Sequence, residues 1–367
     1  MKIAFRTDSS VEIGTGHVMR CLALADELIH RGHECIFITR AHKGHLSEKI
    51  RSHGHRVEML PSDTTCDKQA TRFEWNDHAR WLGTHWEQDA QQTQLVLSDR
   101  AVDWLVVDHY ALDRNWEQLV GKHVSRVFVV DDLADRGHSC DVLLDQNLGR
   151  QVGDYDGLLE ASCLRLVGPQ YALLRPEFAE LRKISVDRRQ NAKVYRLFVS
   201  LGGIDRTNVT GKLLGALSTL ALPSYLELDI VMGSAAPYLE DVQELAKQLS
   251  CTATVSVNVK DMAERMSRAD LAIGAAGSTS WERCCLGLPA ILIVIAENQH
   301  AAAGALKASG AAIIANSIEE ALDALQMLIS SPNSAQVLKR MSVGGSSLVS
   351  GDGCSKVVEL MLGRLKV

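Results

Sequence analysis

The sequence predicts an α/β protein made of two Rossmann-like domains, each with a parallel β-sheet. At 367 residues the chain is longer than one typical hydrophobic core requires. Short apolar runs such as WLVVD at 104–108 alternate with amphipathic segments, which is typical of parallel strands covered by helices on both faces. This alternation begins again near Arg196, after the polar and basic stretch 181–191. The two halves are expected to face each other across a cleft.

These breaks in the pattern predict the domain boundaries. The N-terminal domain is expected to span 1–185 and the C-terminal domain 193–345, followed by a C-terminal helix within 346–367 that could pack back on the first domain. Glycine and proline interrupt regular structure between 149 and 176, and a Gly/Ser break is expected at 344–353.

Buried strands and amphipathic helices alternate in the first half. The expected strands are 2–7, 34–39, 55–60, 104–108, 126–130 and 140–145. The expected helices begin after Gly16 and at 44–53, 77–95 and 114–123. In the segment 77–95, Trp81, Leu82 and Trp86 fall at near-helical spacing, which indicates a packed core stripe rather than a ligand platform.

The second half repeats this order. Its expected strands are 196–201, 227–232, 252–257, 270–273, 289–295 and 311–315. Its expected helices are 208–220, 238–249, 261–267, a short helix ending at Gly287, 298–309, 317–330, 334–343 and 355–365. Polar loops should gather beyond the carboxyl ends of the strands, where such folds bind their ligands.

Composition narrows the functional class. A hydrophobic content of 46% with 23% charged residues is that of a globular protein. The net charge of -6 and the pI near 6.1 argue against a nucleic-acid partner but allow a local basic pocket for an anionic small molecule. No stretch reaches the roughly 18 apolar residues of a membrane span, and the first residues form a strand rather than a signal peptide.

Cysteine and histidine spacing favours a cytoplasmic protein without a metal centre or cofactor. The nine cysteines lack C-x-x-C pairing and are interpreted as reduced core residues. The thirteen histidines have no matching frame of cysteines or carboxylates, so solvated surface positions are the preferred interpretation. A monomer or weak oligomer is expected, although the sequence does not determine the oligomeric state.

The polar loop from Asp8 to Gly16 is followed by a predicted helix, and His17 is expected in its first turn. Unpaired N–H groups there favour a phosphate or carboxylate nearby and disfavour a protonated imidazole. A neutral imidazole on the loop that contains Gly14 and Gly16 is a candidate general base. The alternative is an ordinary glycine-rich β–α turn that happens to contain a histidine.

Three polar strand ends should share one rim of the first sheet, which strengthens the case for His17. They are Asp8 with His17, Asp108 with His109, and Asp131 with Asp132. Each acid could instead cap a helix, and for Asp131 and Asp132 both interpretations stay open.

The second domain carries a loop of small residues at 274–282. Its glycines, including Gly277, let backbone N–H groups approach an anion, and the hydroxyls of Ser278, Thr279 and Ser280 can cap the next helix. Glu282 could accept hydrogen bonds from a ribose diol, or it could complete a capping box. The loop lacks the P-loop pattern.

Arg175, between apolar residues and Pro176, could hold a phosphate or carboxylate with its planar fork. The alternative for this arginine is a surface position in the linker.

Taken together, these motifs resemble the PseG family of UDP-sugar hydrolases. The matching stretches are RTDSSVEIGTGHVMRCLALA at 6–25, VVDHYALD at 106–113, VVDDLADRGHSCDVLLDQN at 129–147, YALLRPEF at 171–178, SLGGIDRTN at 200–208 and GAAGSTSWE…ENQ at 274–299. Members hydrolyse UDP-2,4-diacetamido-2,4,6-trideoxy-β-L-altropyranose in pseudaminic acid biosynthesis, and they are related to the spore-coat protein SpsG. The resemblance implies a MurG-like GT-B fold.

The resemblance also implies a mechanism and its residues. Water would attack the anomeric carbon with inversion, without a metal, and His17 would be the general base. Arg175, Glu282 and Asn298 would contact the UDP-linked diacetamido-trideoxyhexose. A MurG-like glycosyltransferase is the main alternative, and a hydrolysing epimerase and a nucleotide-sugar sensor are two more. The segment 61–95 is matched by none of these motifs.

Overall fold

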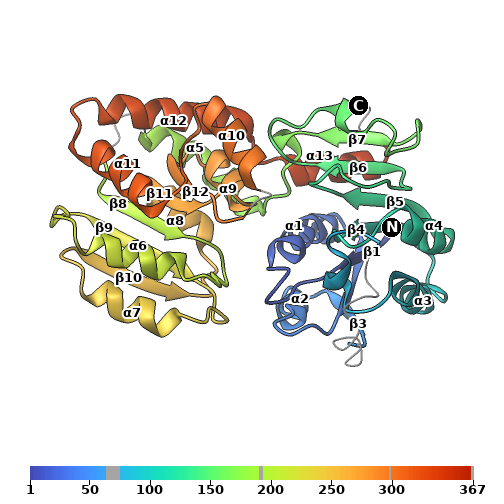
Figure 1. Ribbon diagram of the computed structural model, residues 1–367. Coiled ribbons are helices and arrows are strands. Elements are labelled where there is room, and N and C mark those ends of the chain that lie inside the picture. Colours follow the sequence, from blue (N-terminus) through green and yellow to red (C-terminus); the bar gives the residue numbers. More distant parts are fainter. Residues whose placement is uncertain (63–74, 190–192, 297–298, 365–367) are drawn as a thin grey trace. The chain divides into compact units, whose positions relative to one another are not determined.

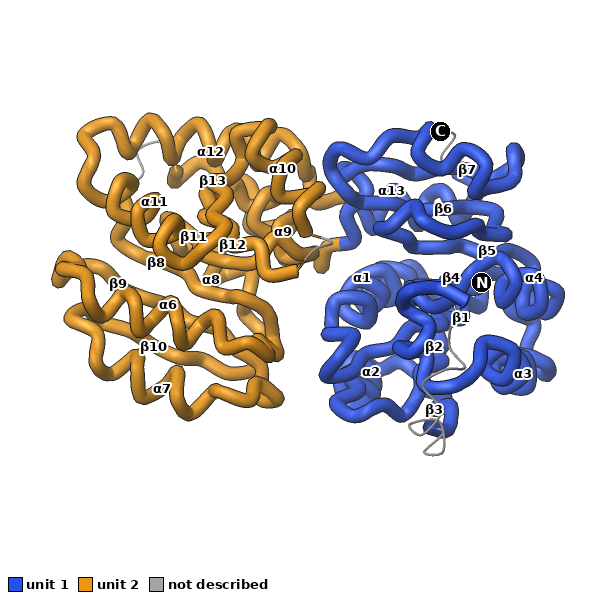
Figure 2. The backbone as a smooth tube through the Cα atoms, in the orientation of Figure 1, with its two compact units in different colours: residues 1–173, 353–367 blue, residues 174–352 orange. Residues whose placement is uncertain are grey.

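The computed structural model describes residues 1–62, 75–189, 193–296 and 299–364 (Figure 1). The chain divides into two compact units, coloured separately in Figure 2. Unit 1 contains residues 1–173 and 353–367, and unit 2 contains residues 174–352. Both are built on parallel sheets with helices, so the predicted fold class is confirmed. The cleft predicted between the domains stays a prediction.

Unit 1 is built on a seven-stranded parallel sheet with the order β3-β2-β1-β4-β5-β6-β7. The strands are β1 (Lys2–Thr7), β2 (Glu34–Arg40), β3 (Arg56–Leu60), β4 (Val102–Asp108), β5 (Val124–Val130), β6 (Val142–Asp145) and β7 (Leu164–Val167). The α-helices are α1 (Gly16–His30), α2 (Ser47–Ser52), α3 (Trp86–Leu97), α4 (Arg114–Val120) and α13 (Gly353–Met361). Short 3₁₀ turns are η3 (Ala79–Leu82), η4 (Gly121–His123), η5 (Val152–Tyr155) and η6 (Pro169–Tyr171).

Alternation along the strands of unit 1 sends side chains into two hydrophobic layers. On β1, Ile3 and Phe5 pack with α1, α2 and α13, whereas Ala4 packs with α3 and α4 on the opposite face. This arrangement follows from the two-residue period of a strand. The sheet is therefore buried on both faces, as the continuous apolar runs predict.

Unit 2 has a six-stranded parallel sheet with the order β10-β9-β8-β11-β12-β13. The strands are β8 (Arg196–Ser200), β9 (Glu227–Met232), β10 (Thr252–Val257), β11 (Leu271–Ala275), β12 (Ala290–Ile293) and β13 (Ala312–Ala315). The helices are α5 (Pro176–Arg188), α6 (Val209–Leu217), α7 (Leu239–Lys247), α8 (Met262–Arg268), α9 (Thr279–Cys285), α10 (His300–Ala308), α11 (Ile318–Ser330) and α12 (Ser334–Leu348).

The strand order reverses between β1 and β4 in unit 1 and between β8 and β11 in unit 2. At such a point the loops after neighbouring strands leave toward opposite faces, which opens a crevice at the carboxyl ends. The loop that carries His17 follows β1, and Asp108 ends β4. The topology therefore places these two predicted residues side by side.

The boundary between the units lies at 173/174, before the polar and basic stretch 181–191 that was expected to link the domains. Most of that linker is helix α5, which packs on α8 and α9 of unit 2. Ser185 donates to the carbonyl of Leu286 at 2.7 Å, and the guanidinium of Arg182 donates to the carbonyls of Cys285 and Ser346. Three arginines of this stretch, Arg182, Arg188 and Arg189, are therefore donors to backbone carbonyls of unit 2.

The C-terminal helix α13 belongs to unit 1, where it packs on α1. Arg31 at the end of α1 forms an ion pair with Glu359 and donates to the hydroxyl of Ser355 at 2.6 Å. The possibility that this helix packs back on the first domain is thus confirmed.

Two helix predictions differ from the structure because of glycines. The segment expected as one helix at 77–95 consists of η3 and α3, separated by Gly83 at φ +69°, a backbone conformation that favours glycine. Conversely, α12 continues through the expected break at 344–353 as far as Leu348. A Cβ on Gly344 would lie 2.9 Å from the carbonyl oxygen of Ser309, so this glycine allows close packing.

A buried ion network joins β1, β2 and α3 in unit 1. Arg6 bridges Asp8 at 2.7 Å and Asp89 at 2.6 Å, and Arg40 also reaches Asp89 at 2.6 Å. All four side chains are fully buried. Burial alone would raise the pKa of Asp89, but the charge and hydrogen bonds of Arg6 and the charge of Arg40 together outweigh it, so this pKa lies below its usual value.

We expect Asp89→Asn to destabilise unit 1 by about 3–5 kcal/mol, because it removes the counter-charge of the buried Arg40 and one of the two carboxylates that pair with Arg6. Because the pKa of Asp89 is lowered in the folded state, its contribution is full above about pH 4 and is lost on further acidification. Urea unfolding at pH 7 measures the difference, with the exposed Asp99→Asn as control. Equal unfolding midpoints for the two variants would contradict this assignment.

The eight cysteines among the described residues are free thiols. None of the helices in the described ranges combines the length and the apolar character needed to cross a membrane.

Candidate active site

His17 lies in the first turn of α1, directly after a tightly folded loop. Gly14 has φ +84°, and its N–H donates to the carbonyl of Ser10 at 2.9 Å. Gly16 is the first residue of the helix, and Thr15 before it makes no capping hydrogen bond with its side chain. The first turn of α1 therefore keeps N–H groups that no capping side chain satisfies.

The His17 imidazole is held by a buried carboxylate. Its Nδ1 lies 2.6 Å from Oδ1 of Asp108, the last residue of β4. Arg20, one turn further along α1, donates two hydrogen bonds to the same carboxylate, from Nε at 2.6 Å and from a terminal nitrogen at 2.7 Å. Burial alone would raise the pKa of Asp108, but the charges of Arg20 and His17 outweigh it and hold this pKa far below its usual value.

This geometry fixes the tautomer of His17. An ionised carboxylate only accepts hydrogen bonds, so Nδ1 must carry the proton that it donates to Asp108. The lone pair of a neutral His17 then lies on Nε2, which has no partner among the described residues and is not among the fully buried unpartnered atoms. His17 is 8% exposed, so Nε2 is available to a ligand at the surface of the unit.

A second acid, Asp132, extends the cluster. Its Oδ2 accepts from Arg20 at 2.5 Å and from the hydroxyl of Tyr110 at 2.9 Å. The Tyr110 ring packs edge-on against the imidazole of His17, with ring centroids 4.6 Å apart. Burial raises the pKa of the Tyr110 hydroxyl, which is therefore a neutral donor to Asp132. Arg20 and Tyr110 thus hold His17 from two sides.

Only some of the residues predicted for this rim lie in the cluster. Asp8 belongs to the buried ion network, and Nε2 of His109 lies 3.3 Å from its Oδ2. Asp131 accepts from the backbone N–H of Ala134 at 2.8 Å and from the hydroxyl of Tyr155 at 3.0 Å. The sequence left open whether Asp131 and Asp132 cap a helix or belong to the site. In the structure Asp131 has a structural role, whereas Asp132 lies in the His17 cluster.

Sequence reasoning missed Arg20 and Tyr110. Arg20 is three residues after His17, a spacing that places two helical side chains on the same face. Tyr110 is two residues beyond Asp108. Both signals are short-range and become informative only when β1 and β4 are known to be neighbours.

In unit 2, the loop between β11 and α9 encloses a buried guanidinium. Arg283 donates to the carbonyl of Ala275 at 2.7 Å and to the hydroxyls of Thr279 and Ser280 at 3.2 and 3.0 Å. Burial lowers its pKa to about 10. A Cβ on Gly274 would lie 2.5 Å from this guanidinium, so the glycine makes room for the charge.

The expectation that the loop hydroxyls cap α9 is wrong. Ser278 occupies the N-cap position without a side-chain hydrogen bond, while Thr279 and Ser280 accept from Arg283. Around Gly277, no atom lies within 4 Å of where a Cβ would be, so its surroundings are open. The loop therefore keeps free N–H groups next to a buried positive charge.

Arg175 and Glu282, predicted separately, lie close together in unit 2. A terminal nitrogen of Arg175 is 3.9 Å from Oε1 of Glu282 and another is 3.0 Å from Glu177. The Arg175 guanidinium also lies over the ring of Phe178 at 5.2 Å. Burial raises the pKa of Glu282, and its Oε2 is buried without a hydrogen-bond partner. An unpartnered acceptor of this kind is suited to a ligand hydroxyl. Asn298 lies outside the described residues.

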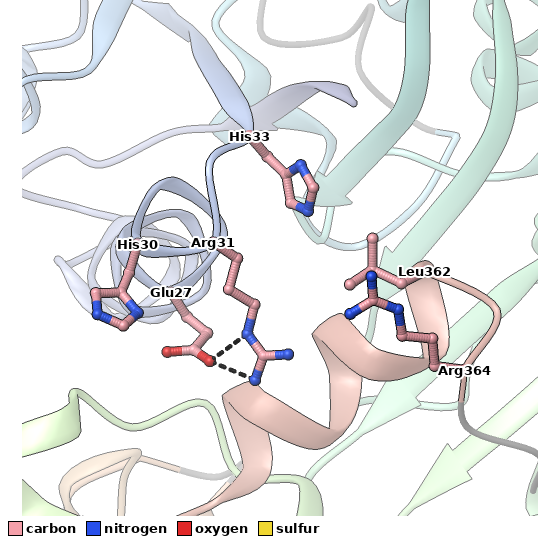
Figure 3. A pocket seen from close by; sticks show the side chains of 6 residues that line it. All are labelled: Glu27, His30, Arg31, His33, Leu362 and Arg364. Atoms are coloured by element: carbon pink, nitrogen blue, oxygen red, sulfur yellow. Dashed lines mark hydrogen bonds and ion pairs between the residues drawn. The ribbon is translucent and has the colours of Figure 1, made fainter.

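The opposite end of α1 borders a separate cavity of about 420 Å³, shown in Figure 3. Its lining residues are Glu27, His30, Arg31, His33, Leu362 and Arg364. His30 lies thirteen positions after His17 on the same helix, about 20 Å along the axis. Arg31 is already paired with Glu27 in this cavity (Figure 3). Within the described ranges, no three His, Cys, Asp or Glu side chains are grouped to hold a metal ion.

Comparison with known proteins finds one matching family model and several relatives. The model of the glycosyltransferase family 28 C-terminal domain matches residues 212–342, within unit 2. The UDP-2,4-diacetamido-2,4,6-trideoxy-beta-L-altropyranose hydrolase of Campylobacter jejuni is 25% identical over 84% of this chain and 97% of its own length. The Bacillus subtilis spore coat polysaccharide biosynthesis protein SpsG is 29% identical over 53% of this chain.

The chain spans 57% of the length of SpsG and 57% of an uncharacterised Methanocaldococcus jannaschii relative, to which it is 25% identical. Among solved structures, Acinetobacter baumannii MurG superposes with a TM-score of 0.67, at 19% identity and over 99% of both chains. The predicted resemblance is therefore confirmed: this chain has the GT-B fold of MurG and is a relative of the Campylobacter hydrolase and of SpsG.

Proposed function

We propose that this chain hydrolyses the sugar–UDP bond of UDP-2,4-diacetamido-2,4,6-trideoxy-β-L-altropyranose, releasing UDP and the free sugar with inversion at the anomeric carbon. The observation that carries the proposal is the His17–Asp108 pair, in which Nδ1 is bound to a charged carboxylate and Nε2 is unpartnered. The name of the Campylobacter relative supplies the substrate.

In this mechanism Nε2 of His17 accepts a proton from one water molecule as the water oxygen bonds to the anomeric carbon. The bond from that carbon to the UDP oxygen breaks, and its electron pair leaves with UDP. Asp108 stabilises the imidazolium that forms, because its carboxylate is already charged and in contact with Nδ1. The diphosphate is a good leaving group, so no strong acid is required.

Unit 2 is proposed to bind the nucleotide. The open loop at Gly277, Ser278 and Thr279 offers backbone N–H groups to the diphosphate, and Arg175 offers its guanidinium. The unpartnered Oε2 of Glu282 is proposed to accept from the ribose diol. The adjacent Arg283 adds a fixed positive charge beneath the loop.

We expect Glu282→Gln to weaken UDP binding about tenfold, or about 1.4 kcal/mol, because a neutral amide replaces the charged acceptor. Titration calorimetry with UDP measures the change. The control is Glu264→Gln, which removes a solvent-exposed acid on α8 of the same unit. If both variants bind UDP like the parent protein, Glu282 is not a nucleotide ligand.

The direct test of the proposed function is to supply candidate UDP-diacetamido sugars without added metal or acceptor. NMR then follows UDP release and the configuration of the first sugar anomer formed. The proposal expects stoichiometric UDP and inverted free sugar. No UDP release from any of these sugars would contradict it.

A MurG-like glycosyltransferase is the second candidate, favoured by the family 28 domain match and the fold. In that reaction an acceptor hydroxyl replaces water, and His17 would deprotonate it. UDP would then be released only when an acceptor is present, which the same NMR experiment distinguishes.

A further inference from the structure

Two aromatic side chains from the segment before α3 stand together beside the His17 cluster. His78 precedes the 3₁₀ turn η3, and the N–H of Trp81 donates to its carbonyl at 2.8 Å. Side chains three residues apart eclipse each other in a 3₁₀ turn. The two rings consequently lie with centroids 4.6 Å apart.

These rings extend the aromatic surface that begins at His17. Trp81 stacks near the Tyr110 ring at 5.8 Å and 24°, and His78 lies 5.3 Å from that ring. Tyr110 in turn packs on His17 at 4.6 Å. His78, Trp81 and Tyr110, called the aromatic wall below, thus form one continuous group of rings next to the candidate base.

The aromatic wall is anchored to the loop after β4 by hydrogen bonds. The indole N–H of Trp75 donates to the carbonyl of Ala111 at 2.8 Å, and the Asn76 amide donates to the carbonyl of Tyr110 at 3.3 Å. The Asn76 side-chain oxygen also accepts from the N–H of His78 at 2.9 Å. These bonds fix the segment that carries His78 and Trp81 relative to Tyr110 before any ligand binds.

Two polar groups on this wall are unused. The indole N–H of Trp81 and the ring nitrogens of His78 have no hydrogen-bond partner in the part of the chain that the structure describes, and none of these atoms is fully buried. By contrast, the buried indole of Trp116 donates to Asp89 at 3.0 Å. Both Trp81 and His78 are half-buried, so each presents an apolar ring and a free polar edge.

Burial lowers the pKa of His78, so the ring is neutral near pH 7 and adds no charge to the wall. A neutral aromatic surface with a free N–H donor fits a ligand that combines an apolar patch with a carbonyl acceptor. An N-acetyl group is such a ligand, because its methyl packs on a ring while its oxygen accepts a hydrogen bond. A plain hydroxyl in the same place would leave the ring faces uncovered.

We infer that Trp81 and His78 form a specificity subsite for an N-acyl group of the sugar, next to the anomeric carbon attacked at His17. This inference rests on the proposed function and deepens it. It assigns a role in substrate choice to the segment 75–82, in which the sequence pattern indicates only a core stripe.

The test compares Trp81→Phe, Trp81→Ala and His78→Ala in steady-state hydrolysis of the diacetamido UDP-sugar. For Trp81→Ala we expect KM to rise about ten- to hundredfold with kcat within about threefold, the range of losses when an apolar contact with the substrate is removed. Trp81→Phe keeps a ring but loses the donor, and its KM should fall between the parent and the alanine variant. Trp86→Phe, on the neighbouring α3, is the matched control.

A second measurement separates recognition from loss of structure. UDP-glucose, which has no acyl group, should inhibit the parent protein and Trp81→Ala equally well by competing with the substrate. A free acetamido sugar should inhibit the parent protein but not the variant. If the parent protein hydrolyses the substrate and Trp81→Ala has the same KM, the subsite is refuted and the proposed function stands. If the parent protein releases no UDP, the proposed function fails and the inference fails with it.

Discussion

Replacing His17 by asparagine is expected to lower turnover about 10²–10⁴-fold while UDP binding stays at the level of the parent protein. Asparagine cannot accept a proton from water at neutral pH, and a positioned general base contributes about 10²–10⁴ in rate. The nucleotide ligands proposed above lie in unit 2, whereas His17 belongs to unit 1. UDP release by NMR and UDP affinity by calorimetry measure the two effects separately.

The control for this substitution is His30→Asn, at the exposed C-terminal end of the same helix. It changes the same residue type in α1 without touching Asp108, Arg20 or Tyr110. The control should keep the parent rate and the parent UDP affinity. A His17→Asn protein that hydrolyses substrate at a near-parental rate would refute the general-base role.

Local pattern was sufficient to predict the six strands of unit 2 and six of the seven strands of unit 1. The short strand β7 (Leu164–Val167) was missed, because it lies in the stretch where glycine and proline suggest irregular structure. The run WLVVD at 104–108 became β4, and the halves repeat because each strand must be covered by helices on both faces. Glycine was the main source of error. Gly83 ends a 3₁₀ turn, where its left-handed backbone favours glycine. Gly344 lies inside helix α12, where the carbonyl of Ser309 leaves no room for a Cβ. The sequence letter is the same in both cases, and only the tertiary contacts differ.

The site was predictable as far as strand order allowed. His17 and Asp108 could be expected on the same rim because strand ends of a doubly wound sheet lie together, but the hydrogen bond between them was not predicted. The distinction between Asp131 and Asp132 was out of reach, since adjacent residues of a loop can face opposite directions. Arg283 was missed for a related reason: an arginine within a helix normally faces solvent, and only the space at Gly274 buries this one.

Replacing Asp108 by asparagine is expected to lower kcat between about 10²- and 10⁴-fold, the range found when a carboxylate behind a functional histidine is removed. The amide can present its N–H to Nδ1, and the imidazole then carries its proton on Nε2, where the base needs a lone pair. The substitution also leaves Arg20 with Asp132 as its one remaining counter-charge among the described residues, so unfolding by urea must be measured beside the rate. Asp103→Asn, on the same strand, is the control because its carboxylate contacts only the exposed N–H of Lys2 among the bonds described.

The combined variant decides whether Asp108 acts through His17. If the carboxylate only fixes and stabilises the imidazole, removing it from a protein that already lacks His17 should change the residual rate little, because groups that act as a unit are strongly non-additive. His17→Asn with Asp108→Asn should then hydrolyse substrate about as slowly as His17→Asn alone. If the two losses multiply, Asp108 contributes independently of the imidazole, and the hydrogen bond of 2.6 Å between them is not the route of its effect. That result would leave His17 as the base but would require a direct role for Asp108 in binding water or sugar.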